Sequence, residues 1–204
     1  MIKLRNVNID IIKGLCIIMV VAIHTIDVKV YESFFGFLIR NIFNCAVPIF
    51  LGLSGYLINT KIKYNNNKEY WSFIKKRIHR IYIPTLFWSL PFFLYNIYKG
   101  NPLIKSLLLF FICGYGVFYF IAVLLQYNLL IRLMLYISKK TKRVFVALLI
   151  SVSYVFIINY ILHIKGYSLP LISYAGFFPL WIVFFVFGIY LKTILNCLYI
   201  GIYF

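Results

Sequence analysis

Long apolar stretches alternate with short polar segments along this chain of 204 residues. Most of the apolar stretches are long enough to cross the hydrocarbon core of a bilayer as an α-helix. The pattern predicts an all-α, polytopic membrane bundle of about six transmembrane helices. We expect these helices at residues 9–28, 42–58, 81–98, 117–137, 144–162 and 176–195.

The segments between the predicted spans differ in character. Residues 29–40 are expected to form a loop, and residues 103–113 are too short to span, which indicates an interfacial or re-entrant segment. Residues 59–80 are the most polar part of the chain. From Glu69 onward, apolar side chains recur on one helical side and basic side chains on the other. This periodicity predicts a basic amphipathic helix at the membrane surface.

Composition supports a membrane location. The chain is 64% hydrophobic and 12% charged, so a soluble domain of this length would expose far too much apolar surface. The net charge of +17 comes from basic residues clustered between the apolar runs, which favours cytoplasmic loops of a membrane protein over nucleic-acid binding. If the N-terminus is cytoplasmic, nearly all Lys and Arg residues lie on the cytoplasmic side. We therefore predict an N-in topology in a bacterial inner membrane, with membrane lipid as a partner.

The four cysteines offer no evidence of a metal site or a disulfide. Cys16, Cys45, Cys113 and Cys197 each lie in an apolar run without the spacing of metal ligands. We interpret them as small buried hydrophobic residues and predict no metal and no cofactor.

The first predicted helix carries four ionisable residues, which are Asp10, Lys13, His24 and Asp27. Lys13 and His24 are eleven positions apart, so they share a helical face at a separation of roughly 16 Å along the axis. Asp10 can reach Lys13, and Asp27 can reach His24, because each pair is three residues apart. His24 could act as a general base oriented by Asp27, or could simply bond a neighbouring helix.

A second candidate site lies in the basic amphipathic segment. Arg77 and Arg80 are three residues apart, with Lys76 beside them, and paired guanidinium groups suit a phosphate or pyrophosphate. Attraction to anionic lipid is the alternative explanation. In the second span, Ser54 lacks the context of a hydrolase nucleophile, so Ser54 and Gly55 are interpreted as a site of close helix packing.

Three motifs resemble membrane acyltransferase family 3, which includes bacterial O-acetyltransferases. The run from Asp10 through Lys13 to His24 resembles the first helix of the family, with Lys13 where Arg is commonest. Residues 46–58 resemble its second-helix signature, which ends in Ser-Gly followed by Phe or Tyr. Residues 73–84 are similar to its Arg-x-x-Arg segment before a proline, here Pro84. Residues 118–122 take the place of its fourth-span motif, with Tyr119 instead of Trp.

The resemblance implies transfer of an acyl group, expected to be acetyl, from cytoplasmic acyl-CoA to a hydroxyl of a cell-envelope polysaccharide or lipid-linked sugar. By the same resemblance His24 is the catalytic histidine and Lys13 assists it, while Arg77 and Arg80 contact the CoA. The chain, taken as one domain over 1–204, is shorter than the usual family domain. We therefore expect it to be incomplete at the C-terminus, with a second chain as one possible source of further helices. Polysaccharide or lipid-carrier export and an inactive fragment are the alternative functions.

Overall fold

The computed structural model describes residues 7–26, 29–30, 33–58, 64, 66–167, 169 and 171–202, with the backbone alone at 117 and 197–202. All regular structure in this part of the chain is helical, which confirms the predicted all-α class. The first half contains α1 (Val7–Thr25), α2 (Phe34–Asn44), α3 (Ala46–Tyr56), α4 (Asn67–Arg77), the π-helix η2 (Ile78–Tyr82), α5 (Ile83–Tyr98) and α6 (Leu103–Phe111).

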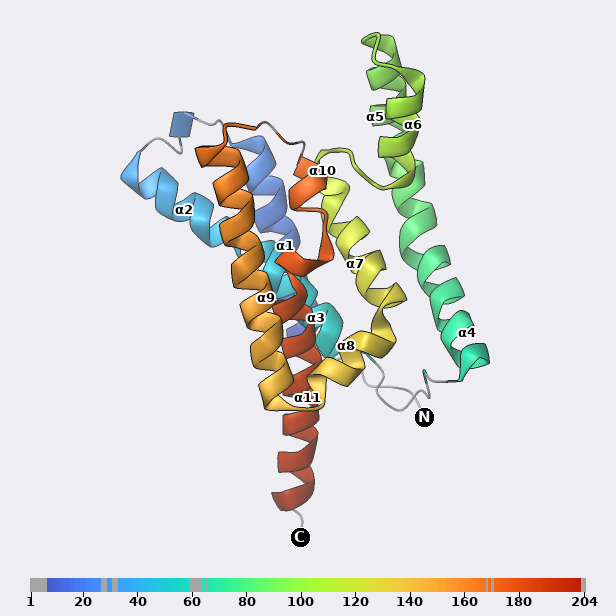
Figure 1. Ribbon diagram of the computed structural model, residues 1–204, viewed down its shortest axis with the longest axis vertical. Coiled ribbons are helices and arrows are strands. Elements are labelled where there is room, and N and C mark those ends of the chain that lie inside the picture. The colour runs from blue at the N-terminus through green and yellow to red at the C-terminus, as the bar shows by residue number, and fades with distance from the viewer. Residues whose placement is uncertain are drawn as a thin grey trace.

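The second half begins with the 3₁₀ turn η3 (Gly116–Phe118) and ends on a long apolar helix. It contains α7 (Tyr119–Leu129), α8 (Ile131–Ser138), α9 (Thr141–Asn159), the π-helix η4 (Tyr160–Ile164), α10 (Leu171–Tyr174), the 3₁₀ turn η5 (Phe178–Leu180) and α11 (Ile182–Ile202). In Figure 1, α4, η2 and α5 form one long helix at the side of the bundle, with α6 folded back against its far part.

Close packing of α3 against α11 forms the centre of the bundle. Gly55 on α3 lies against the backbone of Phe185, and Gly188 on α11 lies against the backbone of Gly52, so a Cβ atom at either glycine would overlap the other helix. Small residues allow membrane helices to approach in this way. The predicted packing role of Gly55 is therefore confirmed. Beside this contact the rings of Tyr127 and Phe185 stack at 4.7 Å.

Sequence cues explain several helix ends. The Ser33 hydroxyl accepts the Gly36 N–H at 3.1 Å to cap α2, and the Asn66 side chain accepts the Lys68 N–H at 2.9 Å to cap α4. The predicted loop 29–40 was wrong in its second half because α2 already begins at Phe34 and contains Arg40. Apolar residues of 34–44 continue the helical pattern, and the chain turns at Cys45 before entering α3.

The described residues hold fewer clear spans than the six predicted. By length and composition three helical stretches can cross a membrane, namely Val7–Thr25, Phe34–Tyr56 and Thr141–Ile164. The predicted span 117–137 is bent in the structure, because α7 and α8 meet at an angle of 75° near Leu130, and together they can form one broken span. The final apolar helix begins at Ile182 rather than 176, since η5 and its flanking turns precede it. The protein is a helical membrane protein.

Candidate functional site

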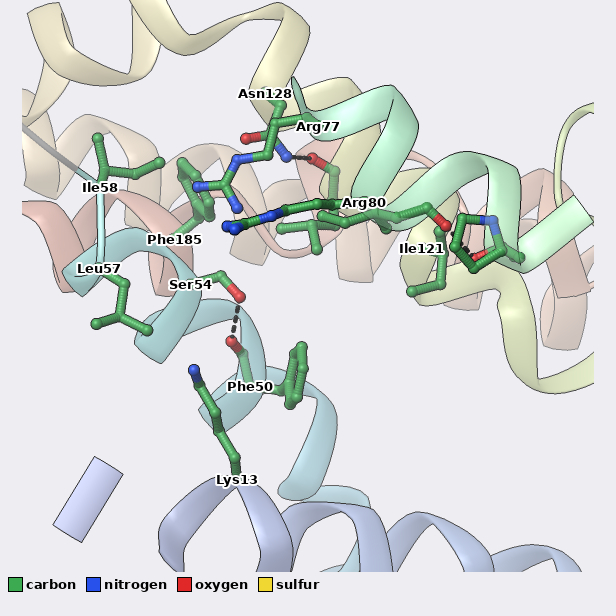
Figure 2. Close-up of a pocket in the computed structure, with 14 residues that line it drawn as sticks. Lys13, Phe50, Ser54, Leu57, Ile58, Arg77, Arg80, Ile121, Asn128 and Phe185 are labelled. Atoms are coloured by element: carbon green, nitrogen blue, oxygen red, sulfur yellow. Dashed lines mark hydrogen bonds between the residues drawn. The ribbon is translucent and has the colours of Figure 1, made fainter. Parts of the chain in front are cut away.

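A cavity of about 380 Å³ opens where α1, α3, α4, η2, α5, α7 and α11 converge. Figure 2 shows polar side chains from several of these helices directed toward its centre. The polar lining residues are Lys13, Ser54, Arg77, Arg80, Thr85 and Asn128, and apolar side chains including Phe50, Leu124 and Phe185 complete the wall. The cavity thus joins segments that lie far apart in sequence.

Three of the lining residues are cations and none is an acid. Lys13 reaches the cavity from α1 past Phe50, while Arg77 and Arg80 enter from the opposite wall (Figure 2). Like charges in a partly buried site repel one another and are costly to desolvate. An anion that enters this cavity would relieve both costs, so the lining is suited to a negatively charged ligand.

Arg80 lies within a widened helical turn, and Arg77 comes directly before it. The Ile83 N–H bonds the carbonyl of Ile78, five residues earlier, which defines the π-helix η2. Pro84 has no N–H to offer the Arg80 carbonyl four residues before it, so the regular α-helical ladder cannot continue through this turn. Single π turns are frequent at functional sites. Pro84 itself also lines the cavity, which gives this predicted motif residue a position in the site.

Arg77 is held more tightly than Arg80. Its guanidinium lies over the Phe73 ring at 5.1 Å, and the residue is half-buried, whereas Arg80 is exposed. Burial lowers the pKa of Arg77, the nearby Tyr64 opposes this effect, and Arg80 lowers the pKa further. The guanidinium remains charged, because arginine starts from a very high pKa.

The neutral polar groups of the cavity bond their own helices. The Ser54 hydroxyl donates to Phe50 O at 2.8 Å, the Thr85 hydroxyl donates to Ile81 O at 2.7 Å, and Asn128 Nδ2 donates to Leu124 O at 2.6 Å. These bonds occupy the donor hydrogens of the two hydroxyls. The hydroxyl oxygens and the Asn128 carbonyl can still accept a hydrogen bond from a ligand.

Arg132 fastens the basic helix α4 to the bend between α7 and α8. Its Nε donates to Tyr64 O, and its terminal nitrogen donates to the Asn67 side chain, both at 2.7 Å. The guanidinium also lies over the Tyr70 ring at 4.3 Å, and the Tyr70 hydroxyl donates to Leu129 O at 2.8 Å. These contacts fix the start of the helix that carries Arg77 and Arg80. Sequence reasoning assigned Arg132 no such role.

The structure brings together only part of the predicted catalytic set. Lys13 lies in the cavity, but His24 is exposed near the end of α1 and is not part of the lining. Asp27 lies outside the described residues. The Lys13 side chain extends from α1 toward α3 (Figure 2). The role of His24 therefore remains a prediction.

Lys76 was expected beside Arg77 and Arg80 but faces elsewhere. It lines a separate surface groove with Lys68, Glu69, Ser72 and Phe73, because these positions share another face of α4. Sequence reasoning instead missed Thr85 and Asn128, both buried in the cavity wall. A polar residue inside an apolar run was the available signal for each of them. Among the described residues, no group of three or more potential metal ligands comes together.

Comparison with known families gives a match over most of the chain. A family model described as an acyltransferase domain matches residues 6–196, which is nearly the whole chain. No curated protein and no solved structure matches the chain.

Proposed function

Because the chain belongs to acyltransferase family 3, we propose that it moves an acyl group, expected to be acetyl, from acyl-CoA to a hydroxyl of a cell-envelope polysaccharide or lipid-linked sugar. Membership supports acyltransferase activity in general. The donor and the acceptor are our proposal, as is the assignment to a bacterial inner membrane.

The cationic lining of the cavity that contains Lys13, Arg77 and Arg80 is the observation that carries the proposal. Acyl-CoA is a polyanion through its phosphate groups, and Lys13, Arg77 and Arg80 supply three cations without an acid among the lining residues. Guanidinium groups bind phosphate oxygens through charge-assisted hydrogen bonds, and an ammonium adds a mobile point charge. We assign Arg77 and Arg80 to the phosphates and Lys13 to the inner part of the donor.

His24 is the proposed general base. Its imidazole would accept the proton of the acceptor hydroxyl while the oxygen attacks the thioester carbonyl. The carbon–sulfur bond then breaks, and the departing CoA thiolate takes the proton from the imidazolium, so His24 returns to its neutral form. Asp27 is the proposed partner that orients the imidazole. The exposed position of His24 leaves room for an acceptor or a second chain beside α1.

Acyl transfer and donor binding, both measured with the full chain in lipid nanodiscs, test this function. Radiolabelled acetyl-CoA and a crude lipid-linked glycan fraction serve as donor and acceptor, and Arg80→Met is compared with Lys75→Met, an exposed cation that does not line the cavity. We expect Arg80→Met to weaken donor binding about tenfold or more, the loss expected for a charge-assisted hydrogen bond, and Lys75→Met to leave it unchanged. Equal donor binding by both variants would contradict the assignment.

His24 is tested with the same assay. His24→Gln should abolish transfer while donor binding persists, because the base acts on the acceptor. Transfer at the wild-type rate by His24→Gln would remove this residue from the mechanism.

A further inference from the structure

A second, smaller cavity of about 150 Å³ lies between α1, α3 and α7. Its walls include Cys16, Val20 and Val21 from α1, Ala46 and Phe50 from α3, and Phe120 from α7. Apart from the Cys16 thiol, the described lining carries no charged or hydrogen-bonding side chain. Two of the lining residues, Ile17 and Val21, are more than half exposed, so this apolar cavity opens at the surface of the bundle. Its volume is comparable to that of an apolar cavity that accepts a ligand of benzene size.

This apolar cavity adjoins the cationic one. Phe50 belongs to both linings, and its ring meets Phe120 edge-on at 5.8 Å. One aromatic side chain is therefore the shared wall between the site suited to an anion and the site suited to an apolar group. A ligand with a charged part and an apolar end could occupy both by passing Phe50.

The apolar cavity also lies between the two predicted catalytic residues of α1. Lys13, Cys16, Val20 and His24 follow one another at intervals of three or four residues, which keeps them on one face of the helix. Val20 is about 10 Å beyond Lys13 and about 6 Å before His24 along the axis. A group held beside Val20 is thus directed from the cationic cavity toward His24.

We propose that this apolar cavity binds the acyl group of the donor thioester and sets the length of acyl chain that the protein accepts. The inference rests on the proposed use of acyl-CoA. Because Phe50 lines both cavities, the phosphates of such a donor can lie in the cationic cavity while its acyl group lies in the apolar one. The uncharged lining of the apolar cavity suits an alkyl chain. The small volume favours short chains, with Val20 as the residue that limits length.

Donor affinity as a function of chain length tests the proposal. The full chain in nanodiscs is titrated with CoA, acetyl-CoA, butyryl-CoA and octanoyl-CoA, and empty nanodiscs correct for partition into lipid. Each methylene that leaves water for an apolar site should tighten binding roughly fourfold. We expect affinity to rise from acetyl to butyryl and to gain nothing further with octanoyl.

Two substitutions of Val20 change the space available in opposite directions. Val20→Phe fills the cavity, so the gain from acetyl to butyryl should fall to about twofold or less, while CoA itself binds as to wild type. Val20→Ala enlarges the cavity and should extend the gain to longer chains. Ile18→Phe adds the same ring at an exposed position outside the lining, and it should behave as wild type.

The outcomes separate the two levels of the proposal. If the wild-type chain binds neither CoA nor any acyl-CoA, the proposed function fails and this inference fails with it. If CoA binds but the Val20 variants leave the dependence on chain length unchanged, only the acyl cavity is overturned. Loss of co-purified phospholipid from Val20→Phe in native mass spectrometry, without a change in chain-length dependence, would identify a lipid-tail site and also overturn it.

Discussion

Lys13 on α1 and Arg80 on η2 line the same cavity, although one belongs to the first helix and the other to the helical stretch that joins α4 to α5. Lys13 is half-buried on a helix that can span a membrane, and Arg80 follows a helix whose last turn is basic. Their convergence joins a helix that can span a membrane to a helical stretch rich in basic residues.

The charge of Lys13 should contribute to donor binding. Lys13→Met keeps the length of the side chain but removes the ammonium, so we expect CoA affinity to fall about tenfold. The salt dependence of binding should also become shallower in the variant, because one fewer charge contacts the ligand. Titrations of the nanodisc-embedded chain at two ionic strengths measure both effects. Unchanged affinity and salt dependence would place Lys13 outside the donor site.

Pro84 should matter for the orientation of Arg80. Pro84→Ala restores an N–H that can bond the Arg80 carbonyl, which favours a regular α-helical turn over the π turn. The arginines would then shift relative to the cavity, and CoA affinity should fall about tenfold, comparable to the loss of one charge-assisted hydrogen bond.

Pro91→Ala provides the matched control for this change. Pro91 lies inside α5, is exposed and does not line the cavity. CoA affinity should therefore match that of the wild type. Equal affinity losses in both proline variants would indicate a general effect on the helix rather than on the turn that holds Arg80.

The contact between α3 and α11 should be intolerant of added volume. Gly188→Ala and Gly55→Ala each place a Cβ atom against backbone of the facing helix, and backbone cannot move aside as a side chain can. We expect each change to lower the free energy of unfolding by about 1–3 kcal/mol, the usual cost of overpacking. Thermal and detergent unfolding of the purified chain measure the loss.

Gly14→Ala is the control for these two glycines. A Cβ atom at Gly14 meets nothing within 4 Å, and the residue lies within α1. Because alanine favours a helix over glycine by about 1 kcal/mol, this change should be neutral or stabilising. Destabilisation by Gly14→Ala equal to that of Gly188→Ala would show that the effect does not arise from close helix packing.

Arg132 should position the basic helix rather than bind the donor. Arg132→Met removes both hydrogen bonds to the start of α4, so amide hydrogen exchange should rise over residues 66–71. CoA affinity should fall by less than for Arg80→Met, since Arg132 is not among the lining residues. Lys139→Ala, an exposed change near the end of α8, should alter neither measurement. Unchanged exchange in Arg132→Met would rule out the anchoring role.

The sequence alone determined the helical membrane class and the basic helix before Arg80, and it predicted Lys13, Arg77 and Arg80 as site residues. Each depends on local information, namely the length of apolar runs, the helical period and the cost of charge within lipid. The packing role of Gly55 could be predicted for the same reason, because small residues permit close helix contact wherever they occur.

The tertiary structure decided which polar residues share a cavity. Lys76 is next to Arg77 in sequence, but it lies on another face of α4 and lines a different groove. No local rule predicts that Asn128 of α7 lines the same cavity as Lys13. The bend near Leu130 and the apolar cavity between Lys13 and His24 also depend on how separate helices pack. Such relations arise from contacts between distant segments, which the helical period of a single segment does not encode.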